Sequence, residues 1–565
     1  MIKFSKIFLA LIISGISALA QTSVIPNSWH MMDKEADGYS GVSANKAYEF
    51  LKSKNLKSKT VIVAVIDTGI DTLHEDLKSI LWNNPKEIPA NGKDDDGNGY
   101  IDDVHGWNFL GGKDGRNVKV DSDERGRVYY GLKDKWDNKE VDKSKLSKAD
   151  LYEYEMFVKA KAEIKGTDSK EDEFNDVDVP ALKALHASLL VSDSILKKGM
   201  NRDTFTGNEL DQYVTKSFAE RRAKTEILTL MKNNNMMDQS DKEFIGGLLE
   251  YIEYIEGEQR KAQAKVSAPK TYRKDIVGDD ENNFNDNKYG NSDIMADFSM
   301  HGTHCAGIIG AARNNGKGMD GIADNVRIMS LRVVPDGDEH DKDIALAIRY
   351  AVDNGAQIIS MSFGKSYSPQ KVWVDEAFAY AESKNVLLVH AAGNDNKDVD
   401  VADNFPNPNY VNGGRASNVI TVGASAEPLS GKQVATFSNY GKKEVDVFSP
   451  GAKIYSTLPG GNNYGNLSGT SMACPLVAGI AALTLEYFPG LSAKQLKYVI
   501  EKSAIQPKGK VNKPGTEDEK VAMSELSRTG GIVNAYEAVK LAATLTGENK
   551  NENLPKPTMT KPKKG

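Results

Sequence analysis

The chain has very little cysteine, since only Cys305 and Cys474 occur among its 565 residues. A disulfide framework therefore does not hold this protein together. It also lacks an excess of basic residues: the formal net charge is -7 at pH 7, so nothing in the composition points to nucleic acid as a partner. Beyond the first twenty residues we expect no stretch that spans a membrane.

The N-terminus, MIKFSKIFLALIISGISALA, has a basic start, an apolar run and small residues at its end. This pattern predicts a signal peptide over 1–20, cleaved before Gln21. A membrane anchor would need a longer apolar run than this one, which Ser14, Gly15 and Ser17 interrupt. We therefore expect an exported protein, periplasmic or extracellular, with no stable membrane insertion after cleavage.

Short apolar stretches alternate with helical patterns along most of the chain. The run VIVAVI after Thr60 is rich in β-branched residues and does not alternate with polar ones, which is typical of a strand buried on both faces. The alternation predicts an α/β fold, a mostly parallel central sheet with helices on both faces and ligands at the carboxyl ends of the strands. The further strands are expected at 326–334, 358–363, 386–392 and 419–422.

A change of composition divides the chain. From about 111 to 274 it is rich in Lys, Glu and Asp with helical patterns, which predicts an inserted α-helical subdomain with a mostly solvated surface. The Pro- and Lys-rich end is expected to be disordered. The predicted segments are a signal peptide (1–20), an N-terminal extension (21–58), a main domain (59–110 and 275–546), the helical insertion (111–274) and a disordered tail (547–565).

Ser471 stands at the start of a predicted buried helix over 469–488, which is small and apolar on all sides. Pro475 follows four residues later and is expected in the first turn, where a helix tolerates proline. A serine at a helix N-terminus is presented outward beside free backbone N–H groups, which can hold a developing negative charge.

His301 begins the stretch HGTHCAGIIGA, another predicted helix start. The helix dipole is expected to disfavour its cation, and Gly302 lets other segments come close. Asp67, which ends the predicted first strand, needs a donor such as an imidazole N–H if it is buried.

Three segments, AVIDTGID, HGTHCAGIIGA and GTSMACPLVAG, resemble the active-site motifs of the subtilisin-like serine proteases, the subtilases. The resemblance extends over about 59–110 and 275–540. It implies that Asp67 orients His301, that His301 acts as base and then acid, and that Ser471 attacks the scissile carbonyl of a protein or peptide substrate. In AAGNDN, Asn394 matches the asparagine of the oxyanion hole.

The resemblance also implies that the segment SMSFG pairs with an extended substrate. The substrate-binding residues expected there are Ser360, Ser362, Phe363 and Gly364. Cys305 and Cys474 each lie about one helical turn from a catalytic position, as two free thiols or as a disulfide between the two helices.

An acidic segment, NGKDDDGNGYIDDVHGWNF, follows the first positions of a calcium loop. His105 stands where such loops place their last glutamate. A second oxygen-rich segment, GDDENNFNDN, is a weaker candidate, and both can instead be solvated acidic loops. The predicted calcium ligands are Asp94, Asp96, Asn98, Tyr100 through its carbonyl, and Asp102.

Two other functions remain open. The fold can serve as a catalytically idle binding module that uses its helical insertion, although the complete set of catalytic residue types argues against this. The same residues can also transfer the acyl group to an amine instead of water. The sequence carries no signal for the oligomeric state.

Overall fold

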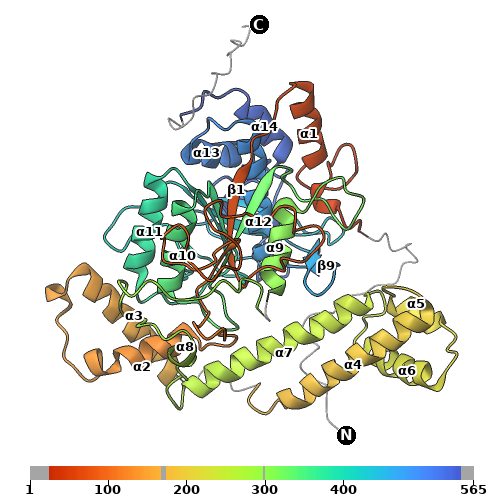
Figure 1. Ribbon diagram of the computed structural model, residues 1–565, viewed down its shortest axis with the longest axis horizontal. Coiled ribbons are helices and arrows are strands. Elements are labelled where there is room, and N and C mark those ends of the chain that lie inside the picture. The colour runs from red at the N-terminus through yellow and green to blue at the C-terminus, as the bar shows by residue number, and fades with distance from the viewer. Residues whose placement is uncertain (1–24, 167–173, 297–298, 549–565) are drawn as a thin grey trace. The chain divides into compact units, whose positions relative to one another are not determined.

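The computed structural model describes residues 25–166, 174–296 and 299–548 (Figure 1). Its centre is a seven-stranded sheet in the order β2-β3-β1-β4-β5-β6-β7, with every neighbouring pair parallel. Almost every strand residue is buried, which explains the apolar, β-branched composition. The predicted α/β fold is confirmed. The strands are β1 (Val61–Asp67), β2 (Gly106–Asn108), β3 (Val326–Arg332), β4 (Ile358–Met361), β5 (Leu387–Ala391), β6 (Val419–Ser425) and β7 (Val447–Pro450).

The strand β1 lies in the middle of this sheet, between β3 and β4, which come much later in the chain. The register places Asp67 opposite Arg332, at the carboxyl end of both strands. Parallel strands end at one edge of a sheet, so the segments that follow β4 and β5 leave the sheet at the same edge as Asp67. These segments carry Ser362 and Asn394.

Helices cover both faces of the sheet (Figure 1). Ala64 and Ile66 of β1 belong to the core cluster that includes α10 and α11. Val63 and Val65 point to the opposite face, because side chains alternate along a strand, and α9 and α12 also contact β1. These helices are α9 (Met300–Gly310), α10 (Asp341–Asp353), α11 (Lys371–Ser383) and α12 (Thr470–Tyr487).

The helix α12 begins at Thr470, with Gly469 as its N-cap residue. Pro475 therefore lies in the second turn of the helix, and the prediction of a first-turn proline was wrong by a few residues. A proline there has no N–H to donate to the carbonyl four residues earlier, which belongs to Ser471. That carbonyl needs other donors.

The chain forms two compact units. Among the described residues, one unit consists of Ile25 and 174–262, and the other of 26–166 and 263–548. In the smaller unit, α4 and α6 share a core cluster that includes Leu189 and Ile227. Its helices are α4 (Val179–Met200), α5 (Gly207–Gln212), α6 (Phe218–Asn233) and most of α7 (Asp241–Ala264).

This division differs from the insertion predicted over 111–274. The helices α2 (Glu124–Trp136) and α3 (Lys148–Lys165) belong to the unit that holds the sheet. Tyr129 of α2 and Phe157 of α3 share a core cluster with Phe405, which lies between β5 and β6.

Two described helices, α4 and α12, are long and apolar enough to cross a membrane by length and composition alone. The sequence predicts no membrane-spanning stretch beyond the first twenty residues, whereas these two helices have the required length and composition. Most of α12 is buried inside the fold, which accounts for its apolar composition. The helix α4 buries Leu189 and Leu196 within its own unit.

The remaining elements lie in the unit that holds the sheet. The N-terminal helix α1 packs against α14, near the C-terminal end of the described chain. The predicted signal peptide and residues 549–565 of the predicted tail lie outside the described residues. The remaining helices and strands are α1 (Ala44–Ser53), α8 (Tyr272–Ile276), α13 (Ala493–Ser503), α14 (Ala535–Ala542), the antiparallel pair β8 (Ile454–Leu458) and β9 (Asn463–Leu467), and the antiparallel pair β10 (Val511–Asn512) and β11 (Lys520–Val521).

Candidate active site

Asp67 and His301 meet where β1 ends and α9 begins. Nδ1 of His301 lies 2.7 Å from Oδ1 of Asp67. Gly302 makes this approach possible, because a Cβ on it would lie 2.2 Å from the carbonyl oxygen of Gly69. The carboxylate fixes the proton of the neutral ring on Nδ1, which leaves Nε2 as an acceptor. The Asp67 side chain is 2% exposed and the His301 side chain 31% exposed, so the ring can be reached from solvent.

The electrostatics of His301 differ from the sequence expectation. Burial lowers the pKa of His301, but the Asp67 carboxylate more than compensates and holds that pKa well above its ordinary value of 6.5. The helix N-terminus was expected to favour the neutral ring. A full charge in direct contact outweighs the partial charge of a helix end.

Ser471, the second residue of α12, exchanges two hydrogen bonds with Ser362. The hydroxyl of Ser471 donates to the carbonyl of Ser362 at 3.1 Å, and the hydroxyl of Ser362 donates to the carbonyl of Ser471 at 2.9 Å. The carbonyl of Ser471 is the one that Pro475 leaves without a helical donor, and the thiol of Cys305 is a second donor to it at 3.5 Å. Among the described contacts there is no hydrogen bond between Ser471 and His301. Serine hydroxyls in free enzymes often turn to the base only when substrate binds.

Asn394 follows β5 and is held by the start of α12. Its Oδ1 accepts from the N–H of Thr470 at 2.8 Å and from the Thr470 hydroxyl at 3.0 Å. This fixes the amide so that Nδ2 is directed away from Thr470. A Cβ on Gly469 would lie 3.5 Å from both Nδ2 of Asn394 and the backbone N of Ser471. The side-chain amide of Asn394 and the backbone N of Ser471 thus lie on the same side of Gly469, close to the serine.

Both cysteines are free and buried. The alternative of a disulfide between α9 and α12 is therefore not realised in this structure. The sulfur of Cys305 lies 4.0 Å from Nδ1 of His301, and that of Cys474 lies 3.6 Å from the hydroxyl of Ser360. Burial raises the pKa of both thiols, that of Cys474 to about 12, so they are neutral packing groups at physiological pH.

Comparison with known proteins identifies the family of this chain. The family model of the subtilase family matches residues 58–532. The chain belongs to the subtilase family. It is 40% identical over 227 residues to the thermophilic serine proteinase of Bacillus sp. (strain AK1), a match over 40% of this chain and 51% of that protein. It is 39% identical over 241 residues to thermitase of Thermoactinomyces vulgaris, which covers 42% of this chain and 75% of thermitase.

The chain thus spans about half the length of the Bacillus proteinase that it matches. Among solved structures, a protease from Pseudoalteromonas arctica PAMC 21717 aligns with a TM-score of 0.43 and 19% identity, over 91% of this chain and 97% of that one.

The expected substrate-binding segment of this subtilase is mostly internal. Ser360 pairs with Val65 of β1 and with Val389 of β5, so both sides of its backbone are occupied and it cannot pair with a substrate strand. Ser362 and Phe363 are also buried. Gly364 is the exposed member of the predicted set.

Gly364 lies against the segment before β6. A Cβ on it would lie 2.8 Å from Oδ1 of Asn404, so a larger residue here would require the Asn404 side chain to move. The next residue, Lys365, pairs in both directions with the backbone of Phe405, at 3.0 and 2.9 Å. Gly364 therefore lies next to the backbone pairing of Lys365 with Phe405, which joins the segment after β4 to the segment before β6.

A buried ion network links Lys365 to α2. The ammonium of Lys365, which is fully buried, lies 2.7 Å from Oε2 of Glu124 and 2.9 Å from Oδ1 of Asp341. Glu124 is also paired with Arg127 at 2.8 Å. Sequence reasoning missed this network, because charges from three distant segments are not recognisable as partners before the fold is known.

The first acidic segment folds as a compact loop between β1 and β2. Asp94 accepts from the N–H groups of Asn98 and Gly99, at 3.1 and 2.8 Å, and Asn98 accepts from the N–H of Tyr100 at 2.7 Å. The carboxylate of Asp102 instead accepts from two N–H groups at the other end of the loop. The structure therefore brings Asp94 near Asp96 and turns Asp102 away.

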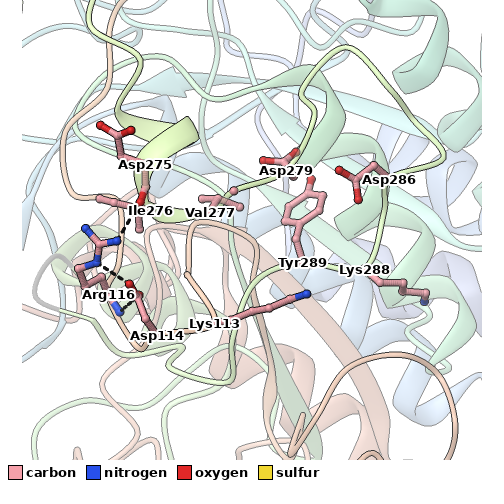
Figure 2. Close-up of a pocket in the computed structure, with 11 residues that line it drawn as sticks. Lys113, Asp114, Arg116, Asp275, Ile276, Val277, Asp279, Asp286, Lys288 and Tyr289 are labelled. Atoms are coloured by element: carbon pink, nitrogen blue, oxygen red, sulfur yellow. Dashed lines mark hydrogen bonds and ion pairs between the residues drawn. The ribbon is translucent and has the colours of Figure 1, made fainter.

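The second acidic segment, 278–287, borders a pocket of about 300 Å³ (Figure 2). Asp279, on its wall, is paired with Arg273 at 2.8 Å and with Lys342 at 2.7 Å. Asp286 accepts from the N–H of Asp280 at 2.8 Å. Side chains of the protein thus already neutralise the buried carboxylate of this segment. None of the four residues predicted as catalytic from the sequence, Asp67, His301, Asn394 and Ser471, lines this pocket.

Proposed function

We propose that this chain is an exported serine endopeptidase that hydrolyses peptide bonds through Asp67, His301 and Ser471, with Asn394 in the oxyanion hole. The contact between Asp67 and His301, at the same sheet edge as Ser471, is the observation that carries the proposal. Membership of the subtilase family supports it.

The mechanism follows from the hydrogen bonds of the site. Ser471 turns from the carbonyl of Ser362 toward Nε2 of His301, gives up its proton there and attacks the scissile carbonyl carbon. The resulting oxyanion accepts from Nδ2 of Asn394 and from the N–H of Ser471. Asp67 keeps the ring oriented and stabilises the imidazolium.

Collapse of this intermediate releases the amine product and leaves an acyl enzyme. His301 gives its proton to the leaving amine. A water molecule then loses a proton to Nε2 and attacks the acyl carbon, which frees the new carboxylate and restores Ser471.

A fluorophosphonate probe tests the nucleophile without knowledge of the substrate. We expect one adduct on Ser471, mapped by mass spectrometry, which is absent in Ser471→Ala and forms much more slowly in His301→Ala. Ser468→Ala, which removes an exposed serine three residues away, is the matched control and should label normally. Failure of the folded protein to label at all would favour the idle binding module.

Hydrolysis and acyl transfer are separated by the products. Digestion of casein in H₂¹⁸O with an added amine nucleophile should place ¹⁸O at the new C-termini. Products that carry the amine in place of ¹⁸O would show that transfer prevails.

Export and cleavage of 1–20 are part of the proposal. N-terminal sequencing of the protein from its native host should begin at Gln21, and fractionation should place it in the periplasm or the medium. A mature protein that begins at Met1 in the cytoplasm would contradict this part.

A further inference from the structure

Asn394, the residue proposed for the oxyanion hole, lies in a turn that closes around the buried side chain of Asn439. Asn439 comes from the segment between β6 and β7 and is only 1% exposed. Its Oδ1 accepts from the N–H groups of Asp395 and Lys397, at 3.0 and 2.8 Å. One amide oxygen thus holds the chain on the C-terminal side of Asn394.

Asn439 also holds the chain on the N-terminal side of Asn394. Its Nδ2 donates to the carbonyl of Ala392 at 2.8 Å, and its backbone N–H donates to the carbonyl of Gly393 at 2.9 Å. Gly393 has a positive φ of 97°, and a Cβ on it would lie 2.4 Å from Nδ2 of Asn439. The turn can approach this amide so closely only because glycine stands there.

An amide side chain meets two different requirements at position 439. Two N–H groups need an acceptor and the carbonyl of Ala392 faces a donor, and asparagine carries one of each on neighbouring atoms. These partners also decide which end of the amide is the oxygen. Aspartate would keep the acceptor but turn a second oxygen toward a carbonyl oxygen, and alanine would remove the partner of all three backbone groups.

The two ends of the Asn394 side chain are fixed by different residues. Its amide oxygen is held by Thr470, whose hydroxyl also accepts from the N–H of Gly393 at 3.0 Å. The backbone from which the side chain projects is held by Asn439. A donor that stabilises a developing charge must already be in place when the charge forms. A displacement of about 1 Å can lower a rate by about 10²-fold.

We propose that Asn439 is a positioning residue for the oxyanion hole: it fixes the turn that carries Asn394, so that Nδ2 of Asn394 stays where the oxyanion forms. Among the described hydrogen bonds of Asn439, none is to His301 or Ser471, so it acts through Asn394. The inference rests on the proposed peptidase function and adds to it a residue outside the four catalytic positions.

The surrounding backbone should keep the fold intact without this side chain. The N–H of Asn396 donates to the carbonyl of Phe437 at 2.9 Å, and the N–H of Tyr440 donates to the carbonyl of Lys397 at 3.0 Å. These bonds join the two segments on both sides of Asn439. Asn439→Ala is therefore expected to fold with a loosened turn. Asn439→Asp, which keeps the acceptor, serves as the second variant.

The test is a double-mutant cycle on the full mature chain, with steady-state kinetics on a peptide amide substrate. Fluorophosphonate labelling to completion counts the active sites, so that kcat refers to folded enzyme alone. We expect Asn439→Ala to lower kcat by about 10- to 100-fold with little change in KM, and Asn439→Asp to cause a smaller loss. In the Asn394→Ala background, Asn439→Ala should lower kcat by no more than about twofold, because the amide that it positions is absent.

Asn418→Ala is the matched control, since Asn418 is also a buried asparagine and its Nδ2 donates to the carbonyl of Val386 at 2.8 Å. This bond lies at the amino ends of β5 and β6, at the opposite edge of the sheet from Asn394, so kcat per active site should not change. An unchanged kcat in Asn439→Ala, an equal loss in the Asn394→Ala background, or the same loss in Asn418→Ala would overturn the assignment. A parent enzyme that cleaves no peptide would overturn the proposed function itself, and the assignment with it.

Discussion

Ser362 and Ser471 form a reciprocal pair, each hydroxyl donating to the carbonyl of the other residue. The pair exists because Pro475 leaves the carbonyl of Ser471 without its helical donor. The segment after β4 is thereby tied to the start of α12, and the nucleophile is placed relative to the sheet by a contact that the three catalytic motifs do not contain.

Replacing Ser362 with alanine tests this tie. We expect Ser362→Ala to lower the free energy of unfolding by about 1–2 kcal/mol, because a buried carbonyl loses its best donor. Denaturant melts in the Ser471→Ala background measure this without autolysis. The control is Pro475→Ala, which restores a helical N–H donor to the carbonyl of Ser471. In that background, Ser362→Ala should lower the free energy of unfolding by less. If Ser362→Ala lowers the free energy of unfolding equally with and without Pro475→Ala, the role given to Pro475 is wrong.

The activity should depend on pH through His301. The Asp67 carboxylate raises the pKa of His301 above 6.5, and only the neutral ring can accept a proton, so kcat/KM should rise with pH through a midpoint above 6.5. Asp67→Asn removes the cause of the shift and should move that midpoint to lower pH, with kcat reduced by roughly 10⁴-fold. Rate profiles from pH 5 to 10 provide the check, and an unmoved midpoint in Asp67→Asn would refute the assignment.

The contribution of His301 to the free energy of unfolding should fall as pH rises, whereas the activity should rise. A histidine whose pKa is raised on folding stabilises the folded state when it is protonated, so this contribution is complete below the unfolded pKa and is lost as pH rises through the folded one. His301→Gln should remove this pH dependence from the unfolding free energy. Urea melts of Ser471→Ala with and without His301→Gln, at pH 5.5 and 9, give the comparison.

Asn394→Ala should lower kcat by about 10²–10³-fold with little change in KM, because in the proposed mechanism its Nδ2 donates only to the oxyanion. Thr470→Val removes the hydroxyl that helps to orient the amide and should cause a smaller loss. Steady-state kinetics on a peptide substrate measure both. A larger loss for Thr470→Val than for Asn394→Ala would show that Thr470 acts on something other than the amide.

Lys365→Met should destabilise the protein by about 3–5 kcal/mol, because the buried carboxylate of Asp341 loses its cation and Glu124 keeps only Arg127. Adding Glu124→Gln to this variant should recover part of the loss. Thermal and denaturant melts of the single and double variants decide this, and independent, additive costs would mean that the two side chains are not coupled.

The sequence was sufficient for the features that are local in the chain. The strands β1, β3, β4, β5 and β6 have the apolar patterns expected of them, and the helical patterns predicted within 111–274 correspond to α3, α4, α6 and α7. The contact of Asp67 with His301 also follows from motif order. The strands β2 and β7 were not predicted: β2 has only three residues, and β7 is a short VFSP segment that ends in proline. Ser360 was misjudged because a residue's neighbours in a sheet depend on the strand order.

Electrostatic features needed the structure for a different reason. The raised pKa of His301 and the buried ion pairs of Lys365 arise from groups that are close in space and remote in sequence. Spacing within the acidic loop placed Asp94 and Asp96 close together, as the structure does, and it could not show that Asp102 turns toward the backbone.

The position of β1 between two strands made much later in the chain has a consequence for folding. The sheet cannot start to assemble around β1 until β3 and β4 exist, so the contacts that define this fold are highly non-local and should make folding slow. The entropy of closing such a loop grows only with the logarithm of its length, by about 0.6 kcal/mol per doubling. The connection between β1 and β3 is long in any case. The additional residues of the helical unit within it therefore add little to the entropic cost of folding.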